Sequence, residues 1–143
     1  MTEKARADIQ KLVNTSKHAF ISAIDSDGFP TTKAMFAMQH DADLRKFYFS
    51  TNVSALSTAQ FEENPKACVY FCNKLRYEGL LFIGTMEVMR DRHHREKLWR
   101  RGDKKYYPQG IDDPDYCVLA FTPVHGRYYN GELFRDTFTM DEL

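Results

Sequence analysis

The side chains between Phe49 and Ser54 are the first group in this sequence whose chemistry suggests a ligand. The segment reads FSTNVS, in which hydroxyls and an amide close a predicted strand, and a predicted helix at about 54–63 follows directly. Hydroxyl donors beside the free N–H groups at the start of a helix form a pocket for an anion. Helix capping by Asn52 or Ser54 explains the same pattern, and capping is the commoner use of these residue types.

Lys33 is a second residue that suggests anion binding. It lies in the segment TTKAM, inside a predicted strand at 31–39. A lysine in such a strand either faces solvent or pairs with a phosphate, and the solvent-facing position is the commoner one.

A basic segment at 90–105 offers two further kinds of chemistry. It contains eight basic and three acidic residues around Trp99. Such a mixture suits either nucleic-acid binding or a solvated helix face with the tryptophan packed inward, and we favour the solvated face. His93 and His94 point in different directions on a helix, so we expect no metal site there. The polar turn at 40–43 needs no metal to explain its histidine and aspartates.

Composition and missing motifs exclude several classes of protein. Lys and Arg together number 20, as do Asp and Glu, so no overall charge points to a polyanionic partner. The sequence contains no glycine-rich loop of the Rossmann or P-loop type, no GxSxG hydrolase motif and no HExxH zinc motif. Its apolar runs fall short of the ~18 residues that span a membrane, so we expect no membrane partner.

The three cysteines indicate a reducing compartment. Cys68 and Cys72 lie in one predicted strand, where four residues span ~13 Å, whereas a disulfide needs Cα atoms within ~7 Å. An odd number of cysteines with this spacing predicts free thiols, so we expect a cytoplasmic protein. We expect Cys68 and Cys72 to be buried as small apolar side chains, with a redox role as the alternative.

The pattern of apolar residues predicts one domain over residues 1–143 with mainly β structure. Helices are expected at 3–16, within an N-terminal helical segment 1–17, at 54–63 and at 92–101; strands are expected at 18–24, 31–39, 45–51, 67–73, 80–89, 116–122 and 125–130; 102–115 is expected to be a loop and 131–143 a polar tail. Short connections favour an antiparallel sheet. Three of the strands are apolar on both faces, which predicts a closed barrel with helices outside, or a barrel packed on a partner.

Several motifs occur together in an order typical of one family. They are DGFP at 27–30, KAM at 33–35, FYFSTN at 47–52, FEENPK at 61–66, GTME at 84–87, LW at 98–99, and YPQG at 107–110 leading to DPDY at 113–116. In this order they resemble the pyridoxamine 5'-phosphate oxidase-like FMN-binding split barrels, in particular the short general-stress-protein branch. The resemblance covers about residues 5–130.

The resemblance implies a mainly β fold with flanking helices: a six-stranded, antiparallel Greek-key split barrel. It also implies a homodimer with two FMN sites at the dimer interface. In such proteins a basic residue and hydroxyls hold the phosphate, a strand backbone lies along the flavin ring, and interface aromatics close the site from the partner chain. The resemblance implies that the phosphate is held by Lys33, Ser50, Thr51, Asn52 and Ser54. It implies that the backbone at Ala34 and Met35 lies along the flavin ring, and that Trp99 and Tyr107 are the interface aromatics.

Departures from the family pattern bear on function. Lys33 stands where the family usually has arginine, and the segment 53–57 lacks the usual basic residue near the start of the helix. The longer C-terminal part of true pyridoxamine phosphate oxidases is also missing, so we do not expect vitamin B6 oxidation. The resemblance implies an FMN-dependent oxidoreductase with no assigned catalytic residue. The open alternative is a non-catalytic, stress-related module that binds flavin, haem or another planar ligand, and nucleic-acid binding ranks below both.

Overall fold

The computed structural model describes residues 1–36, 39–131 and 134–143 of the chain. Its helices are α1 (Glu3–Thr15), α2 (Leu56–Glu63), α3 (Arg92–Leu98) and the 3-10 helices η1 (Arg101–Lys105), η2 (Gly110–Asp112) and η3 (Met140–Glu142). Its strands are β1 (His18–Ile24), β2 (Pro30–Phe36), β3 (Gln39–His40), β4 (Phe47–Asn52), β5 (Lys66–Asn73), β6 (Glu78–Met89), β7 (Tyr116–Tyr129) and β8 (Phe134–Thr139). The helices and strands expected up to residue 89 are confirmed within a few residues, except that part of the strand expected at 31–39 falls on residues 37 and 38, outside the described ranges.

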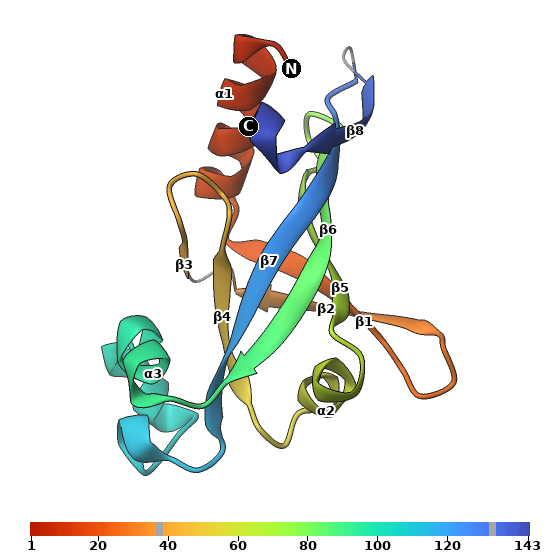
Figure 1. Cartoon of the computed structure of the whole chain (residues 1–143). Coiled ribbons are helices and arrows are strands. Elements are labelled where there is room, and N and C mark those ends of the chain that lie inside the picture. The colour runs from red at the N-terminus through yellow and green to blue at the C-terminus, as the bar shows by residue number, and fades with distance from the viewer. Residues whose placement is uncertain (37–38, 132–133) are drawn as a thin grey trace.

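The strands form one antiparallel sheet in the order β2-β1-β5-β6-β7-β4-β3, with β8 beside β7. The strands at the two ends of this order, β2 and β3, are consecutive in the sequence. Phe36 and Gln39 are three residues apart, so a distance of no more than about 11 Å separates them. The sheet therefore curls into a half-barrel (Figure 1). The expected mainly β, antiparallel fold with flanking helices is confirmed, although the described sheet has eight strands rather than six.

β7 runs without a break through Pro123, where the sequence predicted two strands at 116–122 and 125–130. The pairing of β6 with β7 shifts register between Ile83 and Gly84, and Gly84 lies opposite Pro123. A Cβ atom at Gly84 would collide with the carbonyl oxygen of Thr122, so only glycine lets the two backbones approach this closely. Proline lacks an N–H group and is tolerated at such irregularities, which explains why one long strand passes the proline.

Phenylalanines fill the inside of the curled sheet. The ring of Phe47 lies 5.7 Å from Phe71, 5.3 Å from Phe82 and 6.2 Å from Phe121, measured between centroids, and all four side chains are buried. The apolar face of α1 packs against the same core. Burial of these large aromatic side chains removes apolar area from water and so stabilises the fold.

The segment 131–143, expected to be a polar tail, closes one end of this core; its residues 132 and 133 lie outside the described part. β8 pairs with β7, and η3 follows it. Phe138 and Met140 are 2% and 6% exposed and belong to the core. The Arg6 Nε group donates a hydrogen bond of 2.6 Å to the Glu142 carbonyl, which ties the C-terminal segment to α1. Because polar residues lie between the apolar ones, the sequence pattern did not predict this strand.

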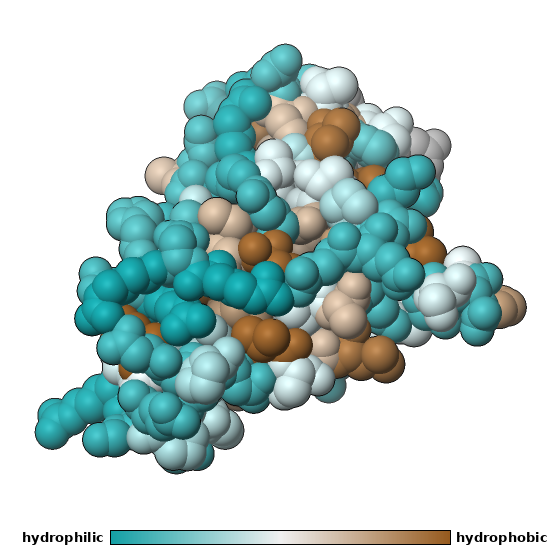
Figure 2. Space-filling view, turned by 60° about the horizontal axis from the view of Figure 1, so that its bottom comes forward, coloured by the Kyte–Doolittle hydropathy of each residue, from teal (hydrophilic) through white to brown (hydrophobic). Residues whose placement is uncertain are grey.

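α2 and α3 lie at the other end of the sheet, on opposite sides (Figure 1). α3 ends at Leu98, three residues before its predicted end at 101, because Trp99 adopts an extended backbone and packs against Tyr116. The predicted loop at 102–115 contains most of η1 and all of η2. Viewed from this end, apolar side chains lie near the middle of the face and hydrophilic ones surround them (Figure 2).

All three cysteines are free thiols, as predicted. Cys117 is buried, whereas Cys72 is exposed, so the expected burial of both β5 cysteines is wrong. Cys68 and Cys72 lie on the outer face of β5, and the alternate positions Val69 and Phe71 fill the core. Among the helices described, none combines the length and apolar composition that crossing a membrane requires.

Candidate functional site

Strands β2 and β4 bring the two anion-binding candidates of the sequence to the walls of one cavity. This larger cavity has a volume of about 300 Å³. It is lined by Lys33, Ala34, Met35, Phe36, Ser50, Thr51, Asn52, Asp103, Tyr106 and Tyr107. Seven of the nine residues implied for the flavin site therefore share it, whereas Ser54 and Trp99 do not line it.

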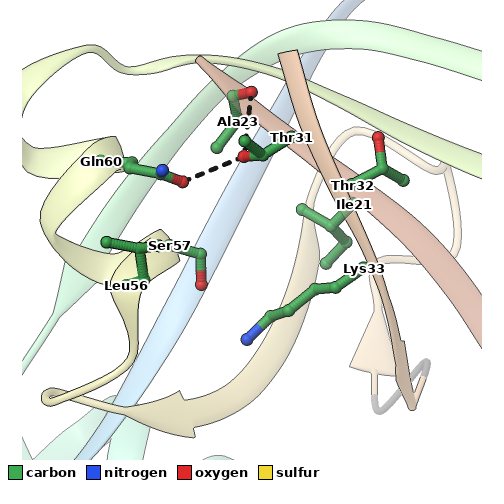
Figure 3. A pocket seen from close by; sticks show the side chains of 8 residues that line it. All are labelled: Ile21, Ala23, Thr31, Thr32, Lys33, Leu56, Ser57 and Gln60. Carbon is green, nitrogen blue, oxygen red and sulfur yellow. Dashed lines mark hydrogen bonds between the residues drawn. The ribbon is translucent and has the colours of Figure 1, made fainter. Parts of the chain in front are cut away.

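A second, smaller cavity of about 160 Å³ adjoins the first at Lys33. It lies between β1, β2 and α2 and is lined by Ile21, Ala23, Thr31, Thr32, Lys33, Leu56, Ser57 and Gln60 (Figure 3). Lys33 is the one charged side chain among these lining residues. Its ammonium group extends toward the start of α2 (Figure 3), so the electrostatic potential in the smaller cavity is positive.

The register of β1 and β2 explains why Lys33 points into these cavities. Lys33 lies opposite the buried Ile21. Met35 lies opposite the buried Ala19. Because side chains alternate across a strand, Lys33 and Met35 share the inner side of β2 while Ala34 faces outward. β2 stands at the end of the sheet order, so the lysine remains exposed and open to a ligand.

The first turn of α2 adds hydrogen-bond donors to the smaller cavity. Ala55 precedes the helix and makes no side-chain hydrogen bond to it, so the first N–H groups have no cap. The Ser57 hydroxyl oxygen is buried and has no hydrogen-bond partner among the described residues. A buried hydroxyl without a partner costs about 1–3 kcal/mol. Figure 3 shows this hydroxyl and the Lys33 ammonium pointing into the same space, which fits a bound acceptor.

Asp115 engages the donors of Asn52 and Ser54. Its carboxylate accepts hydrogen bonds from Asn52 Nδ2 at 2.7 Å, Ser54 N at 2.8 Å and Ser54 Oγ at 3.0 Å. The bond from Asn52 and then those from Ser54 hold the pKa of Asp115 below its ordinary value. The alternative prediction that Asn52 or Ser54 caps α2 is therefore wrong, because both side chains fasten the end of β4 to the start of β7 instead.

Tyr107 reaches the larger cavity from an aromatic cluster of its own chain. Its ring centroid lies 4.7 Å from that of Tyr116 and 6.2 Å from that of Trp99. Burial raises the pKa of Tyr107, so the phenol stays protonated at neutral pH. Trp99 packs 5.4 Å from Tyr116 and lines neither cavity. Tyr107 thus forms part of the cavity wall, and Trp99 packs against Tyr107 and Tyr116 outside the cavity.

Several residues that line the cavities were not expected from the sequence, including Ser57, Gln60 and Tyr106. Thr31, which also lines the smaller cavity, donates a hydrogen bond of 3.1 Å to Gln60 Oε1 and so joins β2 to α2. The strand pattern could have identified Thr31, because it lies two residues from Lys33 on the same side of β2. Gln60 and Tyr106 carry no such signal, since their positions depend on how α2 and η1 pack.

Two of the basic residues at 90–105, Arg90 and Arg92, form ion pairs with nearby carboxylates. Arg92 forms ion pairs with Glu96 at 2.7 Å and with Asp112 at 2.6 Å. Arg90 pairs with Glu62. These contacts support the solvated helix face that we favoured over nucleic-acid binding. Within the described ranges, no three His, Cys, Asp or Glu side chains are arranged to hold a metal ion.

Three solved structures are similar to this chain. A protein related to general stress protein 26, of the pyridoxinephosphate oxidase family, from Clostridium acetobutylicum is 39% identical, with a TM-score of 0.88 over 99% of both chains. General stress protein 26 from Bacillus anthracis is 17% identical, with a TM-score of 0.76 over 94% of this chain and 97% of that one. A heme binding protein from Mycobacterium smegmatis is 13% identical, with a TM-score of 0.76 over 99% of this chain and 60% of that one.

A search among curated proteins found no match to this sequence. The sequence does match the family described as pyridoxamine 5'-phosphate oxidase, over residues 5–130. This is the span over which the motifs at 27–116 and their flanking elements indicated the resemblance. The family match and the 39% identity to the Clostridium acetobutylicum protein show that the chain is similar to general stress protein 26 members of one family. The chain belongs to the pyridoxamine 5'-phosphate oxidase family.

Proposed function

We propose that this chain binds FMN in the two cavities that meet at Lys33 and acts as a flavin-dependent oxidoreductase. The observation that carries the proposal is the buried Ser57 hydroxyl, which has no partner among the described residues and faces the same cavity as the Lys33 ammonium. A phosphate supplies the negative charge and the acceptor atoms that this pair lacks. Membership of a family that commonly uses FMN supports the same cofactor.

The smaller cavity suits the phosphate. Lys33 contributes a positive charge, Ser57 a hydroxyl donor, and the first turn of α2 its uncapped N–H groups. None of the described residues that line this cavity is acidic, so no carboxylate opposes an anion there. Each of these donors forms a stronger hydrogen bond with a charged acceptor, such as a phosphate, than with a neutral one.

The larger cavity suits the flavin ring. It is lined by consecutive residues of β2, Ala34 to Phe36, and by the rings of Tyr106 and Tyr107. Aromatic and apolar walls of this kind bind planar rings, and a few polar groups fix the orientation. Ser50 and Thr51, at the end of β4, provide such polar groups.

The bound flavin would supply hydride or electron transfer, and the chain would bind and orient it. Lys33 and Ser57 would hold the phosphate, and Tyr107 would limit the movement of the ring. Asp103 is the one carboxylate among the described residues of the larger cavity, and it accepts a hydrogen bond of 2.8 Å from the backbone N–H of Arg100. We therefore give Asp103 a role in shaping η1 and assign no catalytic residue.

A homodimer forms part of this proposal. On the outer face of the sheet, Tyr70 lies opposite Leu81. Both side chains are half-buried. A second copy would cover this pair, as the interfaces of stable homodimers do. The free thiols favour a reducing compartment, so we place the dimer in the cytoplasm.

A second candidate function is the storage or sensing of a planar ligand, such as flavin or haem, without turnover. Lys33 is the one basic residue among those described that line the two cavities, and a lysine offers a phosphate one point charge instead of a two-pronged fork. This weaker anchor favours a ligand that depends less on a phosphate. The similarity in fold to a heme binding protein supports the same candidate.

Titration with FMN and with riboflavin tests the cofactor, because the two share a ring and differ in the phosphate. We expect FMN to bind at least about tenfold more tightly than riboflavin, followed by absorbance or fluorescence of the flavin. Equal affinities would place the phosphate outside the smaller cavity, and no binding of either would overturn the proposal. Addition of NADH or NADPH to the loaded protein then separates the two functions: repeated reduction and reoxidation supports an oxidoreductase, and a flavin that stays oxidised supports storage.

A further inference from the structure

A third cavity, of about 610 Å³, lies away from α2, where the end of α1, the start of β1 and the turn between β5 and β6 meet. It is larger than either cavity of the proposed flavin site. Of the described residues, Ala34 alone lines both this cavity and the larger flavin cavity, so β2 separates the two spaces. The residues that line the third cavity include Lys17, His18, Phe20, Cys72, Lys74 and Leu75.

The lining of the third cavity is basic. Lys17 and Lys74 supply two positive charges, and the imidazole of His18 lines the cavity beside them. None of the described residues of the lining is acidic. Neither lysine takes part in an ion pair with another described residue. Two unneutralised charges beside one concave space attract an anion.

The same cavity also presents apolar surface. Phe20 is 39% exposed and Leu75 is 94% exposed. The ring centroid of His18 lies 4.9 Å from that of Phe36, so aromatic surface continues from β1 to β2. Exposed apolar side chains beside charged ones mark a surface that binds a partly apolar molecule.

We propose that the third cavity binds a small planar organic anion, such as an aromatic carboxylate or sulfonate. The aromatic body of this ligand lies against Phe20, and its acidic group is held by Lys17 and Lys74. The volume falls within the roughly 300–1,000 Å³ that small-molecule sites occupy. This site is separate from the proposed flavin site and does not depend on it, because it uses other charges on the other side of β2.

Two fluorescent dyes test the proposal on the native protein. 8-Anilinonaphthalene-1-sulfonate is an aromatic anion, and N-phenyl-1-naphthylamine has the same rings without the sulfonate. We expect the sulfonate to bind at least about tenfold more tightly than the neutral dye, and its affinity to fall as salt is raised, because the contact is between charges. No binding of the sulfonate, or equal affinities for the two dyes, would each overturn the proposal.

Paired substitutions separate the charges from the apolar contact. Lys17→Ala with Lys74→Ala is expected to weaken the sulfonate at least about tenfold and to leave the neutral dye within about twofold. Phe20→Ala is expected to weaken both dyes. The control, Lys66→Ala with Lys104→Ala, removes the same charge outside the cavity and is expected to change neither. Equal losses in the two double variants would show that the overall charge, and not this cavity, attracts the dye.

Cys72 reports where the dye binds without any substitution. It lines the third cavity and is exposed, whereas Cys68 on the same face does not line it. Alkylation by iodoacetamide, a neutral reagent, is followed at each cysteine by mass spectrometry. We expect saturating sulfonate dye to slow the alkylation of Cys72 several-fold and to leave that of Cys68 unchanged. An unprotected Cys72 would mean that the dye binds elsewhere, which would refute the assignment.

Discussion

The Lys33 ammonium lines both cavities of the proposed flavin site, and no other basic residue described in the structure does so. Its charge is therefore the largest single attraction that the chain offers to a phosphate. An ammonium group attracts an anion from any direction but does not fix its orientation, whereas a guanidinium group does both. The Ser57 hydroxyl and the start of α2 must then supply the direction. The affinity for FMN thus depends on the Lys33 charge and on the Ser57 hydroxyl, and each can be removed separately by substitution.

Substitution of Lys33 by alanine is expected to weaken FMN binding by about 1–3 kcal/mol, the usual effect of removing a hydrogen bond to a charged group. Riboflavin, which lacks the phosphate, should bind equally well to both proteins. Lys33→Arg should restore or improve the affinity, because arginine keeps the charge and adds a second donor. Titration calorimetry measures each of these affinities. Lys66→Ala, on an exposed position of β5, is the matched control, and unchanged FMN affinity in Lys33→Ala would show that this lysine only faces solvent.

Substitution of Ser57 by alanine is expected to have opposite effects on the free and the loaded protein. The hydroxyl has no partner among the described residues, so its removal should leave the melting temperature of the free protein unchanged or raise it. FMN binding should weaken by about 0.5–1.5 kcal/mol, because the bound phosphate loses one donor. Differential scanning fluorimetry with and without FMN measures both effects. A lower melting temperature of the free protein would show that the hydroxyl already has a structural role.

At the scale of elements, local chemistry explains the cap of α3 and the turn before β2 but not the start of α2, and contacts between strands decide the rest. Asp91 caps α3 by accepting a hydrogen bond of 3.1 Å from His94 N, as its residue type predicts. Asp25 accepts bonds from the backbone of the turn before β2, and Gly28 adopts the positive φ expected there. The length of β7 could not be predicted in this way, because its passage through Pro123 depends on a glycine in the neighbouring strand.

Gly84→Ala is expected to destabilise the protein by about 1–3 kcal/mol or more, since its methyl group would collide with the Thr122 carbonyl across the bulge. Gly102→Ala is the matched control: it has no positive φ, and nothing lies within 4 Å of the added Cβ atom. That variant should stay within about 0.5 kcal/mol of the native protein. Urea unfolding followed by circular dichroism measures both. Equal stability of the two variants would show that the bulge tolerates a side chain.

Phe138→Ala tests whether β8 is part of the core. Phe138 is 2% exposed, and its ring lies 6.2 Å from that of Phe82. Its removal should lower the free energy of unfolding by about 3–5 kcal/mol, as deletions of buried phenylalanines do. Phe29→Ala, at a position that is 66% exposed, should cost less than about 0.5 kcal/mol. Urea unfolding measures the free energy of unfolding of both variants. A similarly small loss in both would show that residues 134–143 are a tail outside the core.

At the scale of the whole molecule, the candidate site joins segments that are distant in the sequence. Residue types predicted Lys33 and the polar end of β4, and the curled sheet brings them to one cavity. Ser57 was not predicted, because α2 begins only after Ala55 and its first turn therefore offers a different serine from the expected one. Which serine faces Lys33 depends on how α2 packs on β1 and β2, and this packing is not encoded in any local pattern.

The outer face of the sheet is where the whole molecule is expected to meet a second copy. Leu81 lies opposite Tyr70 on this face, so Leu81→Arg would bury an unpaired charge in the proposed interface. The native protein should sediment at micromolar concentration with twice the 16.7 kDa mass of the chain, and Leu81→Arg as a single chain. Leu75→Arg adds the same charge at a position that is 94% exposed, and it should remain dimeric. A native protein that sediments as a monomer would refute the dimer, and a dimeric Leu81→Arg would place the interface on another face.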